Sequence, residues 1–180
     1  MTIRIVLLIP LGFFQGLEDN APRIVEKTGK YSLQLPSQIQ ATLKGYDSTF
    51  ICWQFDEYDE FTQQSYQVNH HQLPYAIVGD FNGDGKQDVI LDGHNHVNRV
   101  ILAVLSSNEA FGIIELGQFA YISPTNEQSW LQFIPKGTMV QAFESESIEL
   151  KADAFEWVSA KGSSVWHFDN GRFSEVVTGD

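Results

Sequence analysis

The chain has 180 residues, of which 43% are hydrophobic and 13% aromatic; this excludes general disorder and is enough for one domain with a substantial core. Its 23 acidic and 11 basic residues give a net charge of −12, which argues against nucleic acid or an anionic membrane as a partner. Such a charge suits cation binding, although solubility alone also accounts for it.

The first 16 residues allow two interpretations. The apolar run Ile5–Phe14 follows Arg4 and has the length of a signal-peptide core, but it is too short to span a membrane. Pro10 and Gly12 interrupt the run and no clear cleavage site follows, so an N-terminal strand is the alternative. We expect export to the periplasm or the medium, a cytoplasmic location if residues 1–16 form a strand, and no integral membrane segment.

Residues 17–34 are polar and predict an arm, and residues 35–180 predict a single domain. Pro36 near the start of Leu35–Gly45 and the glycine at its end predict a short helix. Three apolar residues spaced four apart, Leu35, Ile39 and Leu43, would form the buried face of that helix.

The segment after this helix predicts one strand and then irregular structure. Ser48–Phe55 is apolar and aromatic and predicts a strand, in which the single cysteine, Cys52, would be a buried thiol rather than a nucleophile. The acidic run Asp56–Glu60 predicts a solvated loop, and Gln63–Leu73, rich in Gln, Asn and His, predicts a further loop.

An oxygen-rich segment, residues 80–88, lies between two apolar runs, Tyr75–Val78 and Val89–Leu91. Side-chain oxygens at alternate positions of a tight loop can converge on one point, and calcium takes six to eight oxygen ligands in flexible geometry. The candidate ligands are the side chains of Asp80, Asn82, Asp84 and Asp88 and the main-chain carbonyl of Lys86. An Asp- and Asn-rich turn that binds no metal is the alternative.

The spacing is close to that of an EF-hand loop, but the bidentate Glu required at position 12 is replaced by Leu91. The flanking runs are β-branched and aromatic, which predicts strands rather than helices. The segment therefore resembles the calcium loops of FG-GAP and VCBS-type repeats, in which the five candidate residues would be the matching ligands. With one loop and no repeat, the chain is too short for a propeller.

The resemblance extends weakly beyond the loop. The order of a Pro-led helix, the calcium loop, the Pro135–Gly137 turn, the Ile148–Ala154 segment and a terminal hairpin is similar to that of small bacterial proteins, often exported, that carry a single loop of this type. The resemblance implies a calcium-binding domain of the cell envelope. Only the loop is specific.

The rest of the chain predicts antiparallel strands. Asp88–Asp92 would pair with Arg99–Leu105, and the uniformly apolar Val100–Leu105 would lie in the middle of a sheet. The Asn170–Gly171 pair predicts a tight turn joining the last two strands. Other expected elements are strands at Phe111–Leu116, Ser147–Lys151 and Asp153–Val158, with a loop at Tyr121–Gln128. The predicted fold class is α+β, mainly antiparallel β-sheet with one short N-terminal helix.

Three function classes are compatible with these features. We favour a non-enzymatic envelope domain in which calcium is structural. The alternative is a module that binds a protein partner, such as an inhibitor or immunity protein, with Tyr58, Phe61 and Tyr66 as possible anchors. A hydrolase is less favoured, because we find no nucleophile elbow, no zinc-protease helix and no phosphate-binding glycine loop.

A second, transition-metal site at Asp92, His94 and His96 is conceivable, but exposed turn histidines are far commoner.

Overall fold

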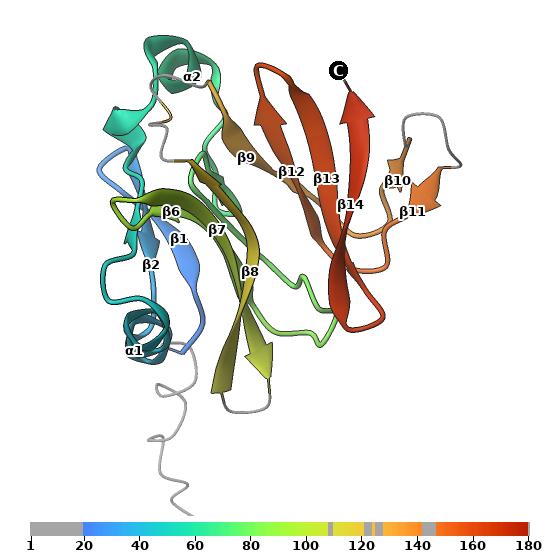
Figure 1. The fold of residues 1–180 in the computed structure, drawn as a ribbon, viewed down its shortest axis with the longest axis horizontal. Helices are drawn as coiled ribbons and strands as arrows, with labels where there is room; N and C mark the ends of the chain where they lie inside the picture. Colours follow the sequence, from blue (N-terminus) through green and yellow to red (C-terminus); the bar gives the residue numbers. More distant parts are fainter. Residues whose placement is uncertain (1–19, 108–109, 121–123, 125–127, 142–146, 180) are drawn as a thin grey trace, which may run out of the picture.

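The structure is a computed structural model that describes residues 20–107, 110–120, 124, 128–141 and 147–179. Two antiparallel sheets, one of six strands and one of four, dominate it (Figure 1). The predicted α+β, mainly antiparallel fold is therefore confirmed. In the described part of the chain no helix is both long and apolar enough to cross a membrane.

The six-stranded sheet has the order β4-β5-β6-β7-β8, and β3 pairs with β6 outside this path. The four-stranded sheet has the order β14-β13-β12-β9. The remaining described strands form two small antiparallel pairs, β1–β2 and β10–β11. The strands of the larger sheet are β3 (Ile51–Cys52), β4 (Gln72–Leu73), β5 (Ala76–Gly79), β6 (Asp88–His94), β7 (Asn98–Ser107) and β8 (Ala110–Ala120). The others are β1 (Arg23–Lys27), β2 (Lys30–Gln34), β9 (Trp130–Ile134), β10 (Met139–Val140), β11 (Ile148–Glu149), β12 (Ala154–Ser159), β13 (Gly162–Asp169) and β14 (Arg172–Gly179).

The two faces of the larger sheet enter two different cores, because successive side chains of a strand point to opposite sides. Ile90 of β6 and Ile101 of β7 pack with Leu131 and Phe155 of the smaller sheet, so this core fills the space between the sheets. The alternate side chains of the same strands, among them Leu91, enter the core on the outer face. The prediction that Val100–Leu105 is covered on both sides is confirmed.

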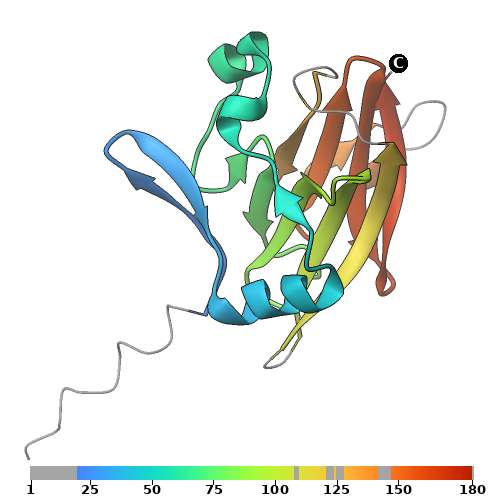
Figure 2. The same cartoon turned by 60° about the vertical axis from the view of Figure 1, so that its left-hand side comes forward.

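The outer face is covered by the helix α1 (Ser37–Tyr46) and by the β1–β2 hairpin, on the side away from the smaller sheet (Figure 2). The predicted helix is confirmed: Pro36 precedes its first residue, and its side chains Ile39 and Leu43 are buried in this core. It does not end before Gly45, as predicted, but continues through this glycine to Tyr46. Leu35 packs against the same core.

Three segments differ from their predictions. Within the expected polar arm, Thr28 and Gly29 have φ of 53° and 76° and turn the chain into the β1–β2 hairpin. A short helix, α2 (Glu60–Ser65), begins at the last residue of the acidic run and extends into the loop expected at 63–73, which ends in β4. The side chain of Asp59 caps this helix by accepting a hydrogen bond from the N–H of Thr62 at 3.1 Å. The strand expected at 48–55 shortens to β3 and is followed by a 3₁₀ turn, η1 (Phe55–Glu57).

The C-terminal predictions are confirmed. Asn170 and Gly171, with φ of 51° and 80°, turn β13 into β14. The strands expected at 111–116, 147–151 and 153–158 correspond to β8, β11 and β12, and the Pro135–Gly137 turn closes with a hydrogen bond from the N–H of Thr138 to the carbonyl of Pro135. Residues 1–16 and almost all of the loop expected at 121–128 lie outside the described residues.

The thiol of Cys52 is predicted to be chemically inert. Burial, together with the nearby carboxylate of Asp92, raises the pKa of Cys52 to about 12. The thiolate is the reactive form, so a disulfide reagent at pH 8 should label the folded protein at least about 100-fold more slowly than the protein unfolded in urea. Rapid labelling of the folded protein, measured by release of a coloured thiol, would contradict this.

Candidate metal site

The loop at residues 80–88 connects β5 to β6 and closes a hairpin of the larger sheet. Its ends are held in register, because Gly79 pairs with Asp88 and Val78 with Val89. Gly83 and Gly85 have φ of 75° and 82°, a backbone region that glycine adopts without steric cost. The predicted sharp turn at Gly85 is thus confirmed.

Side chains at alternate positions fold back onto the loop backbone. Asn82 Oδ1 accepts a hydrogen bond from the N–H of Asp84, and Asp84 Oδ1 accepts one from the N–H of Lys86, both at 2.9 Å. Asp80 Oδ2 accepts a hydrogen bond from the N–H of Gly85, also at 2.9 Å. These contacts hold the side chains of three candidate ligands in place against the backbone of the loop.

The second carboxylate oxygen of Asp80 is different. Asp80 Oδ1 is buried and accepts no hydrogen bond from any residue that the structure describes. Leaving a buried acceptor unsatisfied costs about 1–3 kcal/mol, and more for a charged group. An electropositive group beside this oxygen would remove that cost.

Asp88 is fully buried and binds the backbone of two separate segments. Its Oδ2 accepts hydrogen bonds from the N–H groups of Phe81 and Asn82, at 3.0 and 3.2 Å, and its Oδ1 accepts one from the N–H of Ser106, at 2.6 Å. Burial raises the pKa of Asp88 to about 6, and the hydrogen bonds from these donors limit the rise. The ionised form of the carboxyl group therefore predominates at pH 7.

Ser106, at the end of β7, holds the loop from the neighbouring strand. Its hydroxyl donates to the carboxylate of Asp84, at 3.1 and 3.2 Å from the two oxygens, and its carbonyl accepts a hydrogen bond from the side chain of Asn82 at 2.9 Å. Its N–H is the donor to Asp88 described above. Three of the candidate ligands thus share one residue of β7 as a partner.

Asp153, just before β12, is a residue that reasoning from the loop motif missed. Its Oδ2 accepts a hydrogen bond from the N–H of Asp80 at 2.9 Å, and its Oδ1 accepts one from the N–H of Lys136 at 3.0 Å. Its own N–H donates to the carbonyl of Asp80 at 3.1 Å. Asp153 therefore ties the loop to the smaller sheet; its place in the Ile148–Ala154 segment was the only sequence signal.

The carboxylates do not by themselves form a metal-binding group. In the described ranges, no three His, Cys, Asp or Glu side chains are grouped so that they could hold an ion. The structure therefore does not bring the carboxylates of Asp80, Asp84 and Asp88 together as one group, and these side chains would have to move closer when an ion binds. Lys86 is exposed, and its role as carbonyl ligand stays a prediction.

Nothing matches the chain. Neither a family model, nor a curated protein, nor a solved structure is similar to it. The resemblance to FG-GAP and VCBS-type loops therefore rests on the loop residues alone.

Two residues of the conceivable second metal site, Asp92 and His94, contact other residues, whereas His96 is exposed and its ring lies 5.3 Å from that of His94. Asp92 is buried and paired with Arg99, which donates from Nε to Asp92 Oδ1 at 3.0 Å and from Nη2 to Oδ2. The ring of His94 lies against Trp53, with 4.3 Å between ring centroids, and burial lowers its pKa, with the charge of His96 contributing. This arrangement is typical of a packed core rather than of a metal centre.

The three aromatic residues considered as partner anchors are divided. Tyr58 is 2% exposed and belongs to the outer core. The hydroxyl of Tyr66 donates a hydrogen bond to the carbonyl of Leu131 at 2.6 Å, so its ring is held against β9. Only Phe61, at 61% exposed, presents a large apolar surface to solvent among the three.

Proposed function

We propose that residues 80–88 bind calcium and that the ion stabilises a non-enzymatic domain of the cell envelope. The ligands would be the side chains of Asp80, Asn82, Asp84 and Asp88 and the carbonyl of Lys86. The observation that supports this most directly is the buried Asp80 Oδ1, which has no described donor. A divalent cation beside it would satisfy this oxygen and offset the negative charge of the loop.

The donor set fits calcium better than other ions. All five ligand atoms are oxygens, which calcium prefers, whereas zinc and copper sites rely on His and Cys. Both Asp88 oxygens accept hydrogen bonds, but a carboxylate has about four acceptor positions, so Oδ1, with a single described donor, keeps capacity for an ion. Millimolar affinity would suit an exported protein, because extracellular modules bind calcium at about 10⁻⁴ to 10⁻³ M.

A structural role for the ion is supported by what the loop joins. The loop is held to β7 through Ser106 and to the smaller sheet through Asp153. An ion that rigidifies the loop would therefore stabilise the packing of both sheets. No chemistry at the ion is needed to account for these contacts.

Thermal unfolding in calcium, in magnesium and in chelator tests the proposal. At a calcium concentration about 100 times Kd, binding should stabilise the fold by about 2.7 kcal/mol, which raises the melting temperature by about 5–11 °C. Asp84→Ala should abolish this rise, because it removes one of the proposed ligands. Asp84 is exposed, so the variant should keep its core intact.

Glu149→Ala is the matched control, because it removes one exposed carboxylate far along the chain from the loop. It should keep the full response to calcium. If calcium and chelator give the same melting temperature for the unmodified protein, the loop is a turn that binds no metal and the proposal is wrong.

A further inference from the structure

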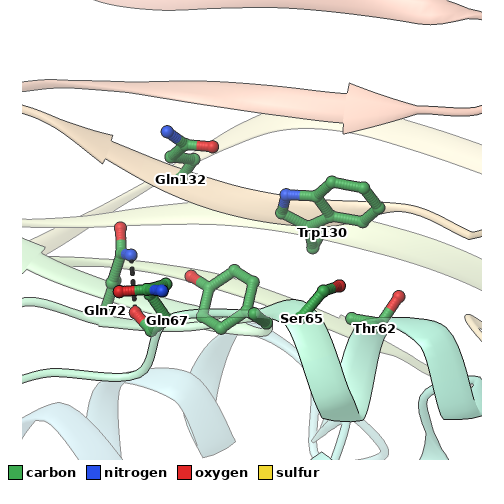
Figure 3. A pocket seen from close by; sticks show the side chains of 7 residues that line it. Thr62, Ser65, Gln67, Gln72, Trp130 and Gln132 are labelled. Atoms are coloured by element: carbon green, nitrogen blue, oxygen red, sulfur yellow. Dashed lines mark hydrogen bonds between the residues drawn. The ribbon is translucent and has the colours of Figure 1, made fainter.

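A second feature of the molecule lies away from the calcium loop. A cavity of about 180 Å³ opens between β9 and the segment that contains α2. Figure 3 shows Trp130 and Gln132 on β9, with Ser65 and Thr62 on α2 across from them. Ligand pockets for drug-sized molecules are about 300–1,000 Å³, so this one has room for a single small ring.

Hydrogen bonds hold the residues that line the cavity in place. Tyr66 donates to the carbonyl of Leu131, and Gln72 Oε1 accepts from the N–H of Phe133 at 2.8 Å. Gln72 Nε2 also donates to the carbonyl of Gln67 at 2.8 Å, the contact drawn in Figure 3. The first two bonds tie Tyr66 and Gln72 to β9, so the cavity is formed in the absence of any ligand.

The rim has polar groups with capacity left for a ligand. Gln67 and Gln132 are exposed, and their side-chain amides make no hydrogen bond with any described residue. Each amide offers two donors and one acceptor. Ser65 uses its hydroxyl hydrogen internally, on the carbonyl of Phe61, which leaves its oxygen as an acceptor. Thr62 is buried, and its hydroxyl donates to the carboxylate of Asp59.

The chemical character of the lining selects one ligand class. No charged side chain is among its residues, so neither an anion nor a cation would find a counter-charge, and the net charge of −12 further disfavours anions. A purely apolar ligand would bury amides without partners, which is unfavourable. A small ring with C–H faces and several hydroxyl groups suits both the Trp130 ring and the amides. We propose that this cavity binds one ring of a neutral saccharide.

Titration with neutral sugars, followed by NMR of the tryptophan indole N–H groups, tests the proposal. Glucose, galactose, N-acetylglucosamine and their disaccharides are the probes, and Trp130→Phe assigns the indole signal. At least one probe should shift the Trp130 signal while leaving the other three tryptophans in place. Glucuronate should bind no more tightly than glucose.

Variants at the rim test the assigned contacts. Gln132→Ala and Gln67→Ala should each weaken binding about 3- to 10-fold, the value of one or more lost hydrogen bonds. Both residues are exposed, so their variants should unfold at the same temperature as the unmodified protein. Gln64→Ala is the matched control, because Gln64 lies on α2 but does not line the cavity, and binding should not change.

Two results would overturn the saccharide proposal. One is the absence of any shift at Trp130 with every neutral sugar up to about 50 mM, which limits the binding free energy to less than about 2 kcal/mol. The other is preferential binding of glucuronate. Neither result bears on calcium, because no residue of the cavity belongs to the 80–88 loop.

Discussion

Replacing Arg99 with Met should lower the free energy of unfolding by about 3–5 kcal/mol, because it leaves the carboxylate of Asp92 buried without its counter-charge. Both side chains are 0% exposed. Arg99 also donates to Ser129 Oγ at 2.6 Å and lies 5.8 Å from the centre of the Trp157 ring, so its loss removes contacts with the smaller sheet too. Thermal unfolding should show a melting temperature lower by about 6–20 °C.

The pair of variants at this site distinguishes a charge effect from a packing effect. Asp92→Leu combined with Arg99→Met should recover most of the loss, because replacing both members of a buried ion pair with apolar residues is often neutral or stabilising. Arg172→Met, at an exposed arginine of β14, should change stability by less than about 0.5 kcal/mol. If the double variant is no more stable than Arg99→Met alone, packing rather than charge sets the cost.

Most of the sheet structure was predictable because it depends on local patterns. Val100–Leu105 is apolar at every position, and this requires burial on both faces, which the two cores provide. Asn170–Gly171 determines the last hairpin because its residues adopt positive φ readily. The helix after Leu35 follows from a proline at its start and a four-residue apolar spacing.

The elements that were missed have weak local signals. The β1–β2 hairpin turns at Thr28–Gly29, which does not mark a turn as strongly as Asn–Gly, and only Ile24 among its residues is fully buried. The helix α2 has six residues, too few for a periodic pattern, and its N-terminus depends on the cap at Asp59. Tertiary contacts rather than propensity therefore stabilise both elements.

The sequence identifies the residues of the candidate loop, but it does not show which parts of the fold each of them contacts. Nine residues of sequence identify four oxygen-bearing side chains, yet they cannot show that Ser106 and Asp153 hold the loop from 18 and 73 residues away. Those contacts come from strand order. As a result, the sequence presents Asp88 as one ligand among several, whereas the fold buries it completely and bonds it to the backbone of β7.

That difference leads to the second large expected effect. Asp88→Ala should cost about 3–5 kcal/mol even in chelator, because it removes the acceptor of three backbone N–H groups, each of which costs about 1–3 kcal/mol when buried without a partner. Asp88→Asn should lie between this variant and the unmodified protein. It keeps the shape of the side chain, but its NH₂ group must face at least one N–H donor, whichever way the amide is turned.

Denaturant unfolding of Asp84→Ala and Asp88→Ala, each in chelator and in calcium, distinguishes a residue that stabilises the fold from one that only binds the ion. Asp84→Ala should change stability little in chelator and should lose only the increment due to calcium, because its carboxylate is exposed. Asp88→Ala should be destabilised in both conditions, because the N–H groups of Phe81, Asn82 and Ser106 need an acceptor whether or not an ion is present. If Asp88→Ala costs no more than Asp84→Ala in chelator, those N–H groups find other partners, and Asp88 keeps only its proposed role as a ligand.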